Sequence, residues 1–442
     1  MTNYSKSKTG LGFRDLFDAM WLATLLLVWI TMFLVASPAP VPGAAESREN
    51  SYSFLVFGDS RIPAYAPYDK NNKEKLDEVI HAVTRYAYSD QEEPPYEAFY
   101  NPNTLQLERI ELPGEKEGQS RTITYGRDGW PDVFLNREVG KAQVSLLASG
   151  QEWVYDNVVR EVREGVKNNE DGPSFVLHTG DIVYFGVQGK SAEESPYWQD
   201  FDLRFYSRLP DGGPGDLSAR FFPVLGNHET WGDENIIGFR EMFPYLNRYG
   251  FNVDNRVYQF DYKNARFIFL DSGIMDPEAP GDWYKSTPSY ETQMDYLTSW
   301  LEEAIADEKD HAFLTLHYPI FSRSGFGPLP EEHNPHSLLK SYADKIDITV
   351  FTGHNHATEA YSVDGVRYFV VGGGGGEQSL APNRMPEDYP EDHYWQGNEQ
   401  KLDYNYLLVE VEGDDVSVIV NHFRPNELEP YGRVNLVPER MD

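Results

Sequence analysis

The stretch SFLVFGDSR, residues 53–61, begins as a run of mostly apolar residues and ends in Gly58, Asp59, Ser60 and Arg61. A short apolar run bounded by a glycine is typical of a strand that is buried on both faces. From Ser53 onward, similar strand-forming runs alternate with segments whose apolar residues have helical spacing. This alternation predicts a layered α/β domain, with the carboxylate of Asp59 at the end of its first strand.

Polar side chains of the same kinds follow four further predicted strands. They are Asp181 after SFVLHTG; Asn227, His228 and Glu229 after FFPVLG; His317 after HAFLTL; and His354 and His356 in TGHNH. In open α/β sheets the carboxyl ends of strands border the ligand-binding crevice, so we expect these groups to converge. Carboxylate and imidazole are good ligands for Zn, Fe, Mn or Ni, and a shared Asp can bridge two ions about 3.5–4 Å apart. The pattern therefore suits a centre of two metal ions.

The pieces GDSR, GDIVYFG, GNHE, LHYP and GHNH occur in the order found in the calcineurin-like metallophosphoesterases, which the chain resembles from about Ser51 to Pro425. Each piece alone is common, but their combination in this order is specific. The resemblance implies a four-layer α/β/β/α sandwich, in which two mixed sheets are flanked by helices. It also implies a phosphoesterase that uses metal-activated hydroxide.

The resemblance also implies roles for individual residues. Asp181 is implied as the ligand that bridges the two metals. The remaining ligands are Asp59 and His356 on the first ion, and Asn227, His317 and His354 on the second. His228 is implied as the acid that protonates the leaving alkoxide, or as a group that steadies the phosphate. Glu229 is expected to orient His228 from behind, as carboxylates commonly do for imidazoles near metals.

Arg61 departs from the family pattern, since most members have a metal-binding His at this position. A guanidinium keeps its protons and has no lone pair for a metal. The first ion would then have only Asp59, Asp181 and His356 as ligands. Arg61 itself is expected to reach the substrate and bind phosphate oxygens in bidentate fashion. The alternative is a salt bridge to a nearby acid.

Tyr184 is a candidate for the missing ligand. The sequence GDIVY matches the Gly-Asp-x-x-Tyr signature of purple acid phosphatases, a branch of the same superfamily that also lacks the first-motif His and in which the tyrosine binds ferric iron. If Tyr184 is a ligand, the expected cofactors are Fe(III) and a divalent Zn, Mn or Fe ion; otherwise they are Mn, Zn or Fe. The alternative is that Tyr184 is a packing residue in the loop after Asp181.

Composition and charge narrow the class of partner. The chain has 442 residues, with 71 acidic and 38 basic side chains and a formal net charge of −33. Such a negative surface repels nucleic acid, so no nucleic-acid partner is expected. The partner that the resemblance implies is a small phosphorylated substrate. The chain contains no cysteine, which excludes thiolate ligands and a cysteine nucleophile. Any metal must therefore be held by nitrogen and oxygen atoms.

The N-terminus predicts a membrane location. An uncharged apolar stretch at 19–36 is just long enough to span a bilayer, and the basic residues lie before it. We therefore expect a cytoplasmic tail (1–18), a transmembrane anchor or signal segment (19–36) and a Pro/Ala-rich tether (37–50). The metallophosphoesterase domain is then expected at 51–425 with an irregular insertion at about 92–139, followed by a C-terminal tail (426–442). The catalytic domain would be extracytoplasmic, or secreted if the segment is cleaved.

Three functional hypotheses follow. The first is a dinuclear metal-dependent phosphoesterase that hydrolyses phosphomonoesters in the manner of acid phosphatases. The second is a phosphodiesterase or pyrophosphatase that acts on nucleotides or lipids. The third, from another class, is a non-catalytic extracytoplasmic binding protein on a degenerate phosphoesterase fold, and Arg61 is its main support. The sequence makes no prediction about oligomeric state.

Overall fold

The structure is a computed structural model, and the chain divides into two units, residues 1–49 and 50–442. Everything described below lies in the second unit. For the outer strands and parts of some helices, only the backbone is described. The described residues are 50–61, 97–100, 107–113, 120–124, 141–168, 172–184, 186, 191–193, 195–230, 233, 235–273, 286–324, 327–376, 392–395, 404–423 and 432–435.

The first large sheet has six strands in the order β16-β15-β14-β1-β5-β6. Its strands are β1 (Ser51–Phe57), β5 (Pro173–His178), β6 (Phe221–Pro223), β14 (Tyr404–Glu412), β15 (Asp415–Phe423) and β16 (Gly432–Asn435). Strands β1, β5 and β6 are parallel, whereas β14 to β16 pair antiparallel. Every residue of β1 after Ser51 is buried, as expected for a strand covered on both faces.

The second large sheet has seven strands in the order β13-β11-β12-β10-β9-β8-β7. Its strands are β7 (Tyr258–Tyr262), β8 (Ala265–Phe269), β9 (His311–Thr315), β10 (Asp347–Thr352), β11 (Thr358–Val363), β12 (Val366–Val371) and β13 (Asp392–Trp395). Its central strands, β8, β9, β10 and β12, run parallel to one another. Both large sheets are therefore mixed, with parallel strands in their interiors.

Aromatic side chains from both sheets fill the space between them. The ring of Phe54 in β1 lies 5.3 Å from the ring of Phe175 in β5, measured between centroids. Across the gap between the sheets it lies 5.3 Å from the ring of Phe267 in β8 and 5.1 Å from that of Phe313 in β9, both edge to face. Burial of each ring contributes roughly 1.5–3 kcal/mol, so this cluster holds the two sheets together.

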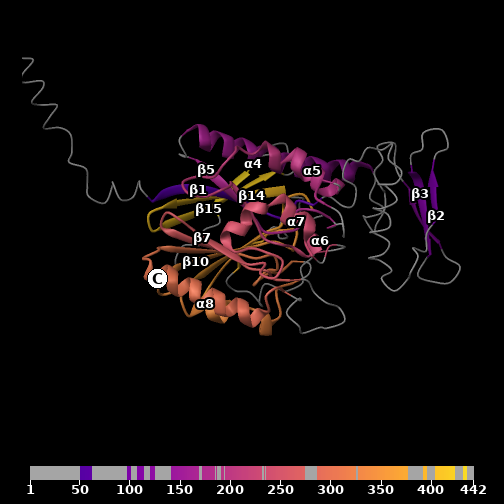
Figure 1. Ribbon diagram of the computed structural model, residues 1–442. Coiled ribbons are helices and arrows are strands. Elements are labelled where there is room, and N and C mark those ends of the chain that lie inside the picture. The colour runs from indigo at the N-terminus through magenta and orange to yellow at the C-terminus, as the bar shows by residue number, and fades with distance from the viewer. Residues whose placement is uncertain are drawn as a thin grey trace, which may run out of the picture. The chain divides into compact units, whose positions relative to one another are not determined.

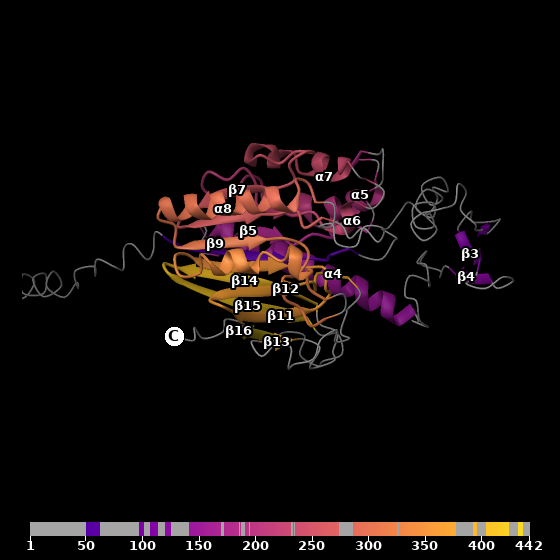
Figure 2. The ribbon, with the colours of Figure 1, turned by 90° about the horizontal axis from the view of Figure 1, so that it is seen from below.

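Helices cover the outer faces of both sheets (Figures 1 and 2). Helix α4 (Lys141–Lys167) packs on β5 and β14 of the six-stranded sheet, and α8 (Tyr290–Ala306) packs on β8 of the seven-stranded sheet. Ser289 caps α8 by accepting the backbone N–H of Thr292. The shorter helices are α5 (Pro196–Arg204), η1 (Tyr206–Arg208), α6 (Asn227–Thr230), α7 (Ile237–Met242), η2 (Pro244–Tyr249), η3 (Glu331–His333) and α9 (His336–Lys340).

The predicted architecture of two mixed sheets flanked by helices is confirmed, and two details differ. The insertion at 92–139 is not wholly irregular, because it contains a three-stranded antiparallel sheet of β2 (Glu97–Tyr100), β3 (Leu107–Pro113) and β4 (Ser120–Thr124). The predicted tail at 426–442 contains β16, which pairs with β15, so the sheet extends beyond residue 425.

The predicted membrane segment at 19–36 lies outside the described residues, as do the tail and tether on either side of it. Among the residues that the structure does describe, no helix combines the length and the apolar character that crossing a membrane requires.

Candidate metal centre

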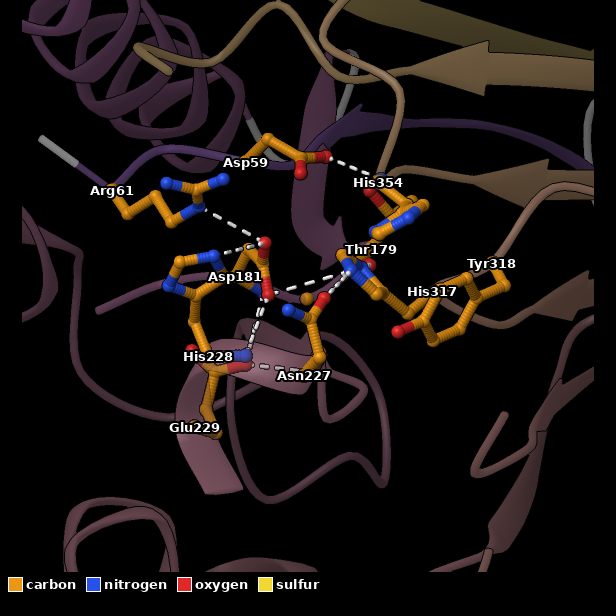
Figure 3. Close-up of polar contacts among 12 residues, drawn as sticks. Asp59, Arg61, Thr179, Asp181, Asn227, His228, Glu229, His317, Tyr318 and His354 are labelled. Atoms are coloured by element: carbon orange, nitrogen blue, oxygen red, sulfur yellow. Dashed lines mark hydrogen bonds and ion pairs between the residues drawn. The ribbon is translucent and has the colours of Figure 1, made fainter. Parts of the chain in front are cut away.

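The polar residues predicted from the sequence follow the carboxyl ends of parallel strands and contact one another (Figure 3). Asp59 follows β1, Asp181 follows β5, Asn227 follows β6, His317 follows β9, and His354 and His356 follow β10. All are buried except His354, which is partly buried. The strand ends of both sheets therefore build one largely buried polar cluster.

Three of these residues have a backbone conformation that side chains other than glycine rarely adopt. The φ angles of Asp59, Asp181 and His354 are 52°, 58° and 66°. Such left-handed conformations are uncommon outside glycine and tend to occur where function constrains the chain. Each follows a glycine, and at Gly58 a Cβ atom would lie only 1.7 Å from Oγ1 of Thr179. The turns after these strands therefore aim the carboxylates and the imidazole into the cluster.

The first half of the centre contains Asp59, Asp181 and His356, whose ligand atoms lie within 4.8 Å of one another. Three such groups could hold a metal ion. Within the described part of the chain, Oδ1 of Asp59 is buried and accepts no hydrogen bond. It lies 3.4 Å from Nε2 of His356. The carboxylate of Asp59 therefore has unused capacity for a cation.

Arg61 occupies this same half. Its Nε donates to Oδ2 of Asp181 at 3.0 Å, and its Nη2 lies 3.0 Å from Nε2 of His356. The salt bridge that was the predicted alternative for Arg61 is present. Contact of Arg61 with a substrate stays a prediction. The guanidinium is drawn to the carboxylate and imidazole that the family pattern assigns to the first ion. With Arg61 in this position, the residues do not fit a metal ion there.

The second half of the centre contains His317 and Asn227, and the side-chain contacts of these two residues that the structure describes include no arginine or lysine. Nδ1 of His317 lies 2.8 Å from the carbonyl oxygen of Thr179, to which it donates. Its Nε2 lies 3.0 Å from Oδ1 of Asn227 and 3.4 Å from Oδ1 of Asp181. Unless the imidazole carries a second proton, three lone pairs face one another. Two ligand atoms that each lie ~2.1 Å from one ion, with a right angle at the ion, are roughly 3 Å apart. The 3.0 Å between Nε2 of His317 and Oδ1 of Asn227 matches this separation, so this half fits a metal ion.

His354 lies beside this second half. Its ring centroid is 5.1 Å from that of His317 and 4.1 Å from that of Tyr318. Its backbone N–H donates to Oδ2 of Asp59 at 2.9 Å, which links the two halves. Burial and the neighbouring His317 lower the pKa of His354 well below its usual value. A neutral imidazole is the form that binds metals.

Asp181 contacts residues of both halves, and its predicted role as a bridging metal ligand stays a prediction. Its Oδ2 accepts from Arg61 and its Oδ1 lies toward His317. Burial opposes ionisation of this carboxyl, but His228, His317 and Arg61 together hold its pKa well below its usual range. Asp181 is therefore a carboxylate at neutral pH, which is the form a bridging ligand needs.

His228 lies at the edge of the centre. Its Nδ1 donates to the carbonyl oxygen of Tyr184 at 2.8 Å, and its Nε2 lies 3.7 Å from Oδ2 of Asp181. Burial and the positive charge of Arg61 lower the pKa of His228 well below its usual value. The imidazole therefore directs Nε2 toward the carboxylate that both halves share, and an anionic ligand that raises its pKa would make it a donor.

Glu229 makes different contacts from those predicted. Its two carboxylate oxygens accept four backbone N–H groups, those of Asp181, Ile182, Val183 and Gly226. Burial and the charge of Asp181 raise the pKa of Glu229 to about 7, whereas the N–H donors favour its ionised form. Glu229 thus fixes the loop that carries Asp181, and the carbonyl of Tyr184 positions His228 instead. The sequence pattern GNHE identifies Glu229, but it does not indicate which backbone N–H groups Glu229 binds.

Tyr184 has two contacts that the sequence did not predict. Its ring lies 5.2 Å from Cζ of Arg61 and 4.9 Å from the ring of His228, measured to the ring centroid. A guanidinium over an aromatic face is a favourable pairing. These contacts agree with the packing alternative for Tyr184, and its role as an iron ligand stays a prediction.

A buried cluster behind Asp59 was not predicted as part of the site. Ser60 Oγ lies 3.0 Å from Nε2 of His178 and accepts from the hydroxyl of Tyr155 at 3.1 Å. Nδ1 of His178 accepts the N–H of Gly180, so Nε2 carries the proton. Burial lowers the pKa of His178 to about 3, which keeps the imidazole neutral. This cluster supports the two turns that present Asp59 and Asp181.

The glycine run at 372–376 contacts the first strand end. The N–H groups of Gly374 and Gly376 donate to the carbonyl oxygens of Gly58 and Asp59 at 2.9 and 2.8 Å. A Cβ atom at Gly374 would lie 2.3 Å from the oxygen of Gly58, so the close approach requires glycine there. The run thereby holds the turn that carries Asp59.

The family model for calcineurin-like phosphoesterase matches residues 148–358, a range that contains most of the centre and begins after Asp59 and Arg61. No curated protein matched.

Several solved structures are similar in fold. GAP50, the anchor in the inner membrane complex of Plasmodium, is 16% identical over 66% of this chain and 85% of its own, with a TM-score of 0.39. A dimetal phosphatase from Danio rerio is 11% identical over 88% of this chain and 100% of its own, with a TM-score of 0.42. The NAD nucleotidase of Haemophilus influenzae is 11% identical over 88% of this chain and 54% of its own, with a TM-score of 0.32.

Proposed function

We propose that this chain, which carries a calcineurin-like phosphoesterase domain at residues 148–358, hydrolyses small phosphomonoesters. The family match supports a hydrolase, and the nitrogen and oxygen ligand atoms gathered in the second half of the centre support a metal-dependent one. The observation that carries the proposal is the second half of the centre. There Asp181, Asn227 and His317 direct oxygen and nitrogen lone pairs at one point.

The chain's own residues have distinct tasks in this proposal. Asp181, Asn227, His317 and His354 would hold a divalent ion, which supplies Lewis acidity and lowers the pKa of a water molecule. Asp181 stays ionised because its positively charged or polar neighbours hold its pKa low. His228 lies within 3.7 Å of the same carboxylate and is placed to bind a phosphate oxygen or to protonate the leaving alcohol.

The charges around the centre favour a monoester over a diester. A phosphomonoester carries up to two negative charges at neutral pH, whereas a diester carries one. The guanidinium of Arg61 adds a permanent positive charge beside Asp181, and a bound ion adds more. The strongly acidic surface disfavours long polyanions, so a small substrate is the better match.

The experiment compares p-nitrophenyl phosphate with bis(p-nitrophenyl) phosphate as substrates of the Mn(II)-loaded full chain. We expect turnover of the monoester, with a lower kcat/KM for the diester. His228→Ala should keep its metal and lose about 10²- to 10⁴-fold in kcat. His336→Ala is the matched control, because His336 contacts Tyr368 and Asp364, away from the centre. Preference for the diester, or full activity in His228→Ala, would contradict the proposal.

A second candidate function is supported by one observation. Arg61 binds two of the groups that the family pattern assigns to the first ion, which is the kind of change expected in a non-catalytic binding protein. The same assay separates the two. Tight binding of inorganic phosphate by calorimetry, with no turnover of either ester, would favour the binding protein.

We also propose that the domain is extracytoplasmic and anchored by the apolar stretch at 19–36. The support is the sequence alone, in which basic residues precede the stretch and none follows until Arg48. The proposal predicts that the full chain stays with membranes after alkaline extraction and is digested by external protease in intact cells from which any outer barrier has been removed. Release of an intact soluble domain would indicate a cleaved signal segment instead.

A further inference from the structure

We propose that the guanidinium of Arg61 takes the place of the first metal ion, so that the centre holds one exchangeable cation instead of two. The inference deepens the proposed function and rests on it for the role of the second ion. It concerns the chemical make-up of the centre, and it is tested by metal content and not by turnover.

The contacts of Arg61 involve the same atoms that a first ion would need. Nε donates to Oδ2 of Asp181, and Nη2 lies 3.0 Å from Nε2 of His356. A guanidinium nitrogen can only donate, so Nε2 of His356 must use its lone pair to accept. A metal ion at this position would need that lone pair and the same carboxylate oxygen. Arg61 and a first ion therefore exclude each other.

The guanidinium is held in this place from more than one side. The backbone N–H of Arg61 donates to the carbonyl oxygen of Asp181 at 3.1 Å. The ring of Tyr184 lies against the guanidinium, with Cζ 5.2 Å from the ring centroid. The side chain of Arg61 is 13% exposed and that of Asp181 is 1% exposed, so little solvent competes for the ion pair. These contacts make the charge a built-in part of the centre.

The negative charge of two carboxylates explains why a guanidinium is stable in the centre. Two buried carboxylates, Asp59 and Asp181, lie close together and need nearby positive charge. An arginine supplies one charge at any accessible pH and does not dissociate. It cannot polarise a substrate oxygen as a Lewis acid or activate water, so those tasks fall to the single ion on the other side of Asp181.

The second half of the centre differs in its contacts. The polar side-chain contacts of Asn227 and His317 that the structure describes are with each other, with Asp181 and with the Thr179 carbonyl, and none is with a guanidinium or ammonium group. Nε2 of His317 and Oδ1 of Asn227, 3.0 Å apart, have the separation of two ligands on one ion. One half therefore has a covalently attached cation, and the other has the donors for an exchangeable one.

The experiment counts metal ions in the full chain. Protein is loaded with Mn(II), and excess metal is removed on a desalting column. Elemental mass spectrometry then gives the number of bound ions per chain, and the electron paramagnetic resonance spectrum of Mn(II) is recorded on the same sample. We expect one equivalent in the native protein, with the spectrum of an isolated ion. Arg61→His restores a ligand at the first position and should bind two equivalents, with a spectrum of two coupled ions. Arg240→His is the matched control, since Arg240 is exposed, and should stay at one.

A second pair of variants tests which half gains the ion. Asp59→Asn alone should keep one equivalent, because Asp59 is not a ligand while Arg61 is present. Added to Arg61→His, it should return the count from two to one. Circular dichroism checks that each variant is folded. Two equivalents or none in the native protein, or one in folded Arg61→His, would overturn the inference, whereas a one-metal protein without turnover would overturn only the proposed function.

Discussion

The two halves of the metal centre are built from the same kind of strand end, yet they have different contents. On one side, Asp59 and His356 follow β1 and β10 and meet the guanidinium of Arg61. On the other side, Asn227 and His317 follow β6 and β9 and face each other across 3.0 Å. Asp181 belongs to both. A guanidinium that follows β1 therefore occupies one half, whereas the described side-chain contacts of Asn227 and His317 in the other half include no guanidinium or ammonium group.

The two halves differ in what a guanidinium and a divalent ion can each contribute to a reaction. A guanidinium and a divalent ion both stabilise buried carboxylates, and both bind phosphate oxygens. Only the ion can act as a Lewis acid and lower the pKa of water. In the proposed function, the half with Arg61 would therefore contribute electrostatic stabilisation, and the half with His317 would contribute the reactive chemistry. The predictions below test this division, in order of decreasing expected effect.

The largest effect is expected at Asp181, where the two halves meet. Asp181→Asn removes the carboxylate that pairs with Arg61 and that lies toward His317. Both halves then lose their common partner, so we expect loss of bound metal and a fall in kcat/KM on the order of 10³-fold or more. Metal analysis and p-nitrophenyl phosphate hydrolysis measure the two effects. Retention of stoichiometric metal would show that Asp181 is not the shared residue.

The second prediction compares one histidine from each half. His317→Ala removes a donor from the half proposed to hold the ion, and metal affinity should fall by more than about 100-fold. His356→Ala removes a partner of Arg61 and should leave one equivalent of metal bound. Titration with Mn(II) measures both affinities, and His336→Ala serves as a control. Loss of the metal in His356→Ala, with retention in His317→Ala, would contradict the assignment of the ion to the half with His317.

The third prediction concerns the loop that supports both halves. Glu229→Gln replaces an oxygen that accepts backbone N–H groups with an NH₂ group that cannot accept. Leaving one or two of these buried donors without a partner should lower the free energy of unfolding by about 2–4 kcal/mol. Urea unfolding measures the loss, and Glu332→Gln at an exposed position is the control. Equal stability of the two variants would mean that the Asp181 loop does not depend on Glu229.

The division into halves also marks what the sequence could predict. The positions of Asp, Asn and His after predicted strands indicated that these side chains would form one cluster. The reason is that parallel strands present their carboxyl ends at the same edge of a sheet. The buried residues of helix α8 recur on one face, which is the helical spacing that the sequence shows between its strand-forming runs. These features depend on local pattern and on strand direction.

The contacts of Arg61 and Glu229 could not be predicted in the same way. Both depend on which distant backbone and side-chain atoms arrive within about 3 Å, and residue type alone does not give this. Arg61 bonds to His356, 295 positions further along the chain, and Glu229 bonds to the loop at 181–183. The sequence did carry a signal at Arg61, because a guanidinium replaces the expected imidazole there. It did not indicate whether that group would face the substrate or the ligands.

The smallest effect is expected at Tyr184, where the prediction tests whether the half with Arg61 also holds an iron ion. If Arg61 fills the first position, the hydroxyl of Tyr184 has no iron to bind, and the ring contributes through its face to the guanidinium. Tyr184→Phe keeps that face, so metal content should be unchanged and the free energy of unfolding should change by less than about 1 kcal/mol. The native protein loaded with iron should lack a tyrosinate-to-iron charge-transfer band in its visible spectrum. A band that disappears in Tyr184→Phe, together with loss of one equivalent of iron, would place an ion in the first half and remove the distinction between the two.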